Sequence, residues 1–196
     1  MADEDLSQIL ALSDKFDNDV LALLAEGWSP TSQRLHICLA FCKAAIEHAI
    51  SQRVLIEAGL HGTALGLIRL QFETVVRAAW VLHGASEEWL AKFSMPVPDG
   101  QLAEPQMGPP IPAMLEAIKI HAPEAEGELR RLNQTMKVMH SFVHGGAHLV
   151  VHALRGYPSE KLVAVQQPQL RGRVGQLSRA HAGCMPPSTS ASFAPT

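Results

Sequence analysis

The chain has 196 residues, of which 47% are hydrophobic and 18% are charged, and its formal net charge is −3. This length suits one domain with one apolar core, and the composition is typical of a folded chain rather than a disordered one. The acidic balance argues against strong binding of duplex DNA, which requires a basic surface.

The cysteine content and the first residues of the chain bear on where in the cell the protein is expected. Three cysteines form an odd and sparse set, which argues against a disulfide framework. The acidic start, residues 1–5, lacks the basic and apolar regions of a signal peptide. No run reaches the roughly 18 apolar residues of a membrane span. We therefore expect a cytoplasmic protein that does not contact a membrane.

The first half of the chain shows helical spacing of its apolar residues. Gly27 and Gly59 follow apolar runs and predict helix ends, and the short turn at 59–62 predicts that the helices on either side of it are antiparallel neighbours. Ser29-Pro30 and Ser86 each have the side chain of an N-terminal cap. The expected helices cover residues 6–25, 30–58, 63–83 and 87–93.

The second half contains a break and then more helices. Eight Pro and Gly residues between 94 and 112 predict an exposed loop. Further helices are expected at 113–121, 123–144 and 147–154. From residue 161 the chain has four basic and no acidic residues and predicts a flexible basic tail. The fold is predicted to be all-α, an up-and-down bundle of about five to seven helices, with one domain over 1–160 and a tail over 161–196.

Two predicted helices carry ionisable residues on their apolar faces. On a wheel of about 100° per residue, Arg69 falls among apolar residues with Glu73 one turn later, and Arg53 repeats this pattern with Glu57. Because the two helices are antiparallel across a short turn, Arg53 and Arg69 are predicted to lie at about the same height, so that two Arg and two Glu share one partly buried space between the helices. Burying a charge costs several kcal/mol unless it is paired. One interpretation is an ion-pair network that fixes helix register. The other is a phosphate site in which Arg69 donates to the ligand and Glu73 orients it.

Four histidines spaced four residues apart surround a double glycine in residues 139–152. Histidine is suited to proton transfer near neutral pH, and glycine permits close approach of a ligand to the backbone. The alternative is that these are ordinary histidines at the edge of the core. The residues singled out along this strip are Asn133, Lys137, His140, His144, Gly145 and Gly146.

No pattern predicts a metal or a cofactor. The double glycine interrupts the histidine ladder, and no carboxylate lies among the four histidines. Cys38 and Cys42 share an apolar face and are interpreted as small core residues. The tryptophans are likewise interpreted as packing residues.

Two segments carry a resemblance. Leu67-Ile68-Arg69-Leu70-Gln71-Phe72-Glu73 and Ser141-Phe142-Val143-His144-Gly145-Gly146 resemble an uncharacterised bacterial all-helical family with an Arg-x-x-x-Glu helix and a later His-Gly-Gly. The resemblance covers about residues 5–158. More distantly, the layout is similar to the HEPN superfamily of helical bundles, and this implies a dimer and, for many members, metal-independent ribonuclease activity in toxin–antitoxin or phage-defence systems.

The sequence departs from the HEPN signature, in which four to six residues lie between an Arg and a His. Eight residues lie between Arg131 and His140. Six residues lie between Lys137 and His144, but Lys137 lacks the planar guanidinium. This departure favours binding without catalysis. The predicted function is binding of a phosphate-bearing ligand, such as RNA or a nucleotide, or of a partner protein, by a homodimer. The alternative is a HEPN-like ribonuclease in which His144 moves a proton and Arg69 and Glu73 complete the site, with Arg53 among the ligand-binding residues.

Overall fold

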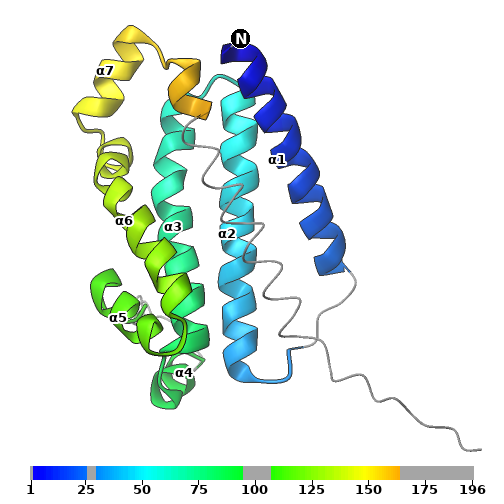
Figure 1. Ribbon diagram of the computed structural model, residues 1–196, viewed down its shortest axis with the longest axis vertical. Coiled ribbons are helices and arrows are strands. Elements are labelled where there is room, and N and C mark those ends of the chain that lie inside the picture. Colours follow the sequence, from blue (N-terminus) through cyan, green and yellow to red (C-terminus); the bar gives the residue numbers. More distant parts are fainter. Residues whose placement is uncertain (1, 26–29, 95–106, 164–196) are drawn as a thin grey trace, which may run out of the picture. The chain divides into compact units, whose positions relative to one another are not determined.

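The computed structural model describes residues 2–25, 30–94 and 107–163, and these residues form helices joined by turns without any strand (Figure 1). The predicted all-α class is confirmed. The helices are α1 (Ala2–Ala25), α2 (Gln33–Glu57), α3 (His61–His83), α4 (Glu87–Phe93), α5 (Ile111–His121), α6 (Pro123–Val143) and α7 (Ala147–Arg155).

The chain divides into two units. Residues 10–157 form one unit, which contains most of α1 and all of α2 to α7, and residues 1–9 with residues 158–196 form the other. In the second unit, residues 159–163 form a short helical segment. The rest of the predicted basic tail lies outside the described residues, and the predicted domain boundary at 160 stays a prediction.

An antiparallel hairpin of α2 and α3 forms the centre of the larger unit (Figure 1). Gly59 takes a left-handed φ of 75°, and the Leu60 N–H donates to Leu55 O at 2.7 Å, which closes the end of α2 as the sequence predicted. Between the two helices, Gln52 Nε2 donates to Gln71 Oε1 at 2.8 Å. Both amides are buried, so this bond fixes the register of the hairpin.

Side chains at the open end of the hairpin satisfy the helix termini. Ser86 caps α4 as predicted, whereas the cap of α2 is Ser32, whose Oγ accepts from the Leu35 N–H at 3.3 Å, and Pro30 precedes the helix. The sequence predicted Ser29 as the cap of this helix. That prediction was wrong, because Ser29 and Ser32 offer the same cap chemistry and the sequence alone does not distinguish them. Arg34 donates to Val81 O and Ala85 O and so caps the end of α3.

Arg53 does not lie beside Arg69 as the helical wheel suggested. Its guanidinium faces α1, where Nη2 meets Asp14 at 2.8 Å and Nε meets Asp17 at 3.3 Å, and Nη1 bonds Glu57 at 3.2 Å. Asp17 is only 3% exposed, so this group ties α1 to α2. The wheel placed Arg53 correctly on a packed face of α2 but not on the face that meets α3.

Helices α5 and α6 pack on α3 on the side away from the hairpin partner. Helix α5 begins at Ile111, with Pro112 in its first turn, two residues before the start at 113 that the sequence predicted. Trp80 and Trp89 meet edge to face with ring centroids 4.7 Å apart, which confirms their predicted packing role. His83, at the end of α3, is partly buried near His121 of α5.

Arg53→Ala should reduce the free energy of unfolding by about 3 kcal/mol, because it leaves the buried Asp17 carboxylate without its guanidinium. Arg131→Ala, which removes an exposed ion pair with Glu128, should cost well under 1 kcal/mol. Urea unfolding followed by circular dichroism measures both. Equal costs for the two variants would show that the Arg53 group does not stabilise the fold.

Stability should fall in mild acid because of His83. Burial, and then the positive charge of His121, lower the pKa of His83 below its ordinary 6.5. The unfolded chain therefore binds this proton more readily, and stability is lost as the pH falls below about 6.5. His83→Gln should lose less stability than the wild type between pH 7.5 and 5.5 in thermal unfolding. His36→Gln, at an exposed position of α2, is the control.

Candidate functional site

The charged residues on α3 form a cluster of two cations around one anion, defined here as the α3 charge cluster of Arg69, Glu73 and Arg77. Arg69 Nε lies 2.9 Å from Glu73 Oε1, and Arg77 Nη1 lies 3.5 Å from Glu73 Oε2. The three side chains are between 22% and 28% exposed, so they are partly desolvated but reach solvent. The sequence predicted the Arg69–Glu73 pair but missed Arg77, which the same four-residue spacing would have revealed.

The positive charge of the α3 charge cluster is not balanced. Glu73 is shared by two guanidinium groups, and no other carboxylate in the described residues pairs with Arg69 or Arg77. In addition, Arg77 Nε is buried and has no hydrogen-bond acceptor among the described residues. A buried donor without an acceptor costs about 1–3 kcal/mol. The cluster therefore combines a net charge of one cation with an N–H group that lacks an acceptor.

Two glycines in the first turns of α3 allow α6 and α7 to approach this helix closely. A Cβ on Gly66 would lie 3.7 Å from the backbone O of Phe142, so the last turn of α6 crosses α3 here. A Cβ on Gly62 would lie 2.6 Å from Leu149 Cδ1 and 2.8 Å from Tyr157 Oη, so these two side chains pack directly over Gly62. Arg69 follows Gly66 by three residues, which places the Arg69 end of the cluster about one helical turn from this crossing.

His144 and the double glycine form the end of α6. Gly145 adopts φ of 66°, the Gly146 N–H donates to Ser141 O at 2.7 Å, and the His144 N–H donates to His140 O at 3.2 Å. This is a Schellman motif, which uses a left-handed glycine to satisfy the last carbonyls of a helix. A Cβ on Gly146 would lie 2.5 Å from Ser141 Oγ. Both glycines thus have a structural role at the end of α6. The sequence had suggested only that they permit close approach of a ligand.

The four histidines separate into two pairs. The rings of His140 and His144 are exposed and lie 4.2 Å apart, centroid to centroid. His148 and His152 instead stack near the buried Phe142 ring, and His152 also stacks on Tyr157 at 5.1 Å. His148 and His152 therefore seat α7, as the alternative interpretation held, and Tyr157 was not singled out from the sequence.

The predicted site residues come together only in part. Arg69 and Glu73 are joined, but no hydrogen bond or ion pair in the described residues joins His144 to either of them. Asn133 and Lys137 lie one turn apart on α6, the first half-buried and the second exposed. The roles proposed for His144, His140, Asn133 and Lys137 stay predictions. The three carboxylates around Arg53 already occupy its donors.

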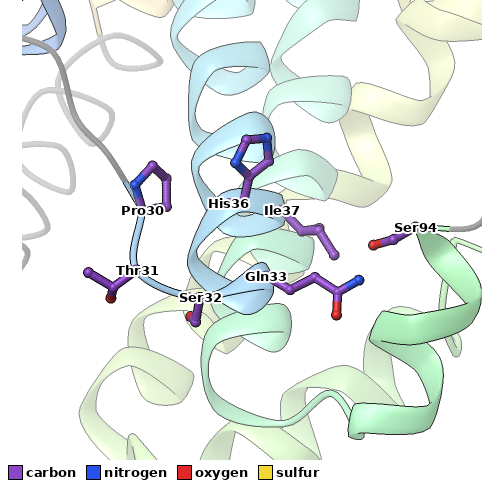
Figure 2. A pocket seen from close by; sticks show the side chains of 7 residues that line it. All are labelled: Pro30, Thr31, Ser32, Gln33, His36, Ile37 and Ser94. Atoms are coloured by element: carbon purple, nitrogen blue, oxygen red, sulfur yellow. The ribbon is translucent and has the colours of Figure 1, made fainter.

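A pocket of about 430 Å³ lies at the start of α2 (Figure 2). Gln33, Ile37 and Ser94 reach into the space between the first turn of α2 and the end of α4, and Gln33 Nε2 donates to Leu90 O at 3.4 Å. Its polar lining consists of the hydroxyls of Thr31, Ser32 and Ser94, the amide of Gln33 and the imidazole of His36, and no ion pair in the described residues joins them.

Two further features concern metals and thiols. Within the described residues, no group of three or more His, Cys, Asp or Glu side chains could hold a metal ion. Cys38 and Cys42 are half-buried on α2, and Cys38 Sγ lies 3.5 Å from Ala78 O. A hydrogen bond with Cys42, together with burial, raises the pKa of the Cys38 thiol. These contacts agree with a packing role.

The comparison with known families adds to this geometry. Residues 42–169 match the family of unknown function DUF6988. The chain belongs to this family. None of the curated proteins and none of the solved structures matches it. The DUF6988 match includes the α3 charge cluster, the Schellman motif and α7, but among the residues that line the pocket of Figure 2 it includes only Ser94. The likeness to HEPN bundles stays a prediction.

One further finding concerns membranes. Among the described helices of this DUF6988 protein, none is both long and apolar enough to cross a membrane.

Gly145→Ala should reduce the free energy of unfolding by about 1–2 kcal/mol, because a left-handed φ is strained for any residue with a Cβ. Gly127→Ala is a matched control within α6. A Cβ there would meet nothing within 4 Å, so this variant should be more stable by about 0.5–1 kcal/mol. Thermal unfolding gives both values. Unchanged stability for Gly145→Ala would contradict the Schellman interpretation.

Proposed function

We propose that this protein binds a small phosphate-bearing ligand, without catalysis, at the α3 charge cluster. The observation that supports this most directly is the buried Nε–H of Arg77, which lacks an acceptor beside a carboxylate that is shared by two arginines. A phosphate bound at the partly exposed side of the cluster would neutralise the excess cation, and one of its oxygens would supply the missing acceptor when the Arg77 guanidinium turns its Nε–H outward. Guanidinium groups suit this task because their planar set of donors matches phosphate geometry.

Glu73 has a specific role in the proposed site. Arg69 lies one turn before Glu73 on α3, and Arg77 lies one turn after it. Glu73 pairs with both arginines and so orients both guanidiniums along one face of the helix. It also repels an incoming anion. Partial exposure of the cluster keeps this repulsion moderate, because solvent screens it. Binding is therefore expected to be weak for inorganic phosphate and stronger for ligands with additional contacts.

Variants of all three residues test the proposal with inorganic phosphate as the probe, measured by isothermal titration calorimetry at low ionic strength. Arg77→Lys keeps the charge but loses the Nε–H and the planar fork, and should weaken binding about fivefold, or about 1 kcal/mol. Arg69→Met should weaken it by at least as much. Glu73→Gln should tighten binding several-fold, because it removes the competing carboxylate.

Arg131→Met is the matched control, since Arg131 is an exposed arginine of α6 paired with Glu128. It should leave phosphate binding unchanged. The proposal is wrong if the wild type binds no phosphate, or if Arg131→Met weakens binding as much as Arg77→Lys does. It is also wrong if Glu73→Gln lowers stability without tightening binding, because the cluster would then be an ion-pair ladder only.

A further inference from the structure

Helix α7 has its apolar face turned to solvent. On a wheel of about 100° per residue, Ala147, Val150, Val151 and Leu154 share one arc. Val150 is 52% exposed, Val151 41% and Leu154 82%, and no residue of α7 is buried. An amphipathic helix usually turns such an arc toward the core. We call these four residues the α7 apolar face.

The opposite side of α7 holds the helix in place. His148 and His152 stack near Phe142 of α6, and Leu149 approaches Gly62 of α3 closely enough that a Cβ there would collide with it. The His148 N–H also donates to Ser141 Oγ at 3.0 Å. The helices that α7 contacts are α3 and α6 (Figure 1). The apolar arc is therefore presented outward by a helix that is anchored through its polar side.

Helix α7 carries no Asp or Glu, and Arg155 is its formally charged residue at pH 7. Arg155 follows Leu154 directly and is exposed without an ion pair in the described residues. The guanidinium at this end of the apolar face would attract a carboxylate of a binding partner.

The size of the face also limits what covers it. Nine residues of helix span about 13 Å, and one face of that length is far below the roughly 800 Å² that each partner buries in a standard interface. A second copy that docked its own α7 here would form a small contact and would offer no carboxylate to Arg155, because α7 has no Asp or Glu. A single amphipathic helix needs only a few anchors at the spacing that α7 provides.

We propose that the α7 apolar face docks an amphipathic helical segment of a partner protein, with apolar anchors on one side and acidic residues along its flanks. The anchors pack on Val150, Val151 and Leu154, and the acidic flank faces Arg155. This inference is independent of phosphate binding at the α3 charge cluster.

A designed peptide tests the proposal on the full chain. The probe is a fluorescein-labelled 15-residue helix with leucines at positions i, i+3, i+4, i+7 and i+11 and mostly glutamates elsewhere, and its match carries lysines in place of the glutamates. Fluorescence anisotropy should show the acidic peptide binding at least tenfold more tightly than the lysine peptide. Leu154→Asn and Val151→Asn should each weaken binding about tenfold, and Arg155→Gln about threefold.

Ile120→Asn is the matched control, because Ile120 is an apolar side chain of α5 that is 74% exposed. Circular dichroism of each variant checks folding. The proposal is overturned if Ile120→Asn weakens binding as much as Leu154→Asn, or if the two peptides bind equally or not at all. It is also overturned if sedimentation shows a wild-type dimer that Leu154→Asn dissociates, since a second copy would then cover the face.

A membrane surface is tested in parallel, with vesicles of phosphatidylcholine containing phosphatidylserine. If wild-type protein sediments with these vesicles and Leu154→Asn does not, while the acidic peptide fails to bind, lipid occupies the face and the proposal is wrong. Absence of vesicle binding together with tight binding of the acidic peptide supports it.

Discussion

The buried amide bond between Gln52 and Gln71 determines how the rest of the larger unit is arranged. Two buried amides that bond each other tolerate little sliding, because any shift would leave polar groups unsatisfied. Glu73 follows Gln71 by two residues, which on a helix places it on nearly the opposite side of α3. The α3 charge cluster therefore points away from α2 as a direct consequence of the hairpin register, toward the side on which α6 and α7 pack.

Helix ends were predictable from the sequence where a local interaction sets them. Ser86 and Gly59 act through bonds to residues a few positions away, so the order of residues along the chain is sufficient to identify them. The pair Arg69 and Glu73 was predictable for the same reason, since residues four apart on one helix are neighbours. The assignment of Arg53 failed because a helical wheel shows which face is packed but not which helix packs against it.

The orientation of α7 was beyond the reach of pattern analysis. The sequence predicted a helix at 147–154, and an amphipathic helix usually turns its apolar arc inward. The structure reverses this because Phe142 offers an aromatic surface to His148 and His152, and because Gly62 leaves room for Leu149 and Tyr157. These contacts join α3, α6 and α7, so no single segment of sequence encodes them. The double glycine was likewise detected for its composition, while its contribution to the end of α6 depends on backbone geometry.

The net charge of −3 conceals a separation of charges that links the two proposals. Acidic side chains hold the scaffold together in local groups, such as Asp14 and Asp17 around Arg53, and Glu116 and Glu126 around Arg130. Two places depart from this compensation. Arg155 of α7 has no ion pair among the described residues, and the α3 charge cluster shares one carboxylate between two guanidiniums. The two ligands that we propose, a phosphate and an acidic helix, are both negatively charged, so each would meet a cation that the scaffold leaves without a full complement of carboxylates.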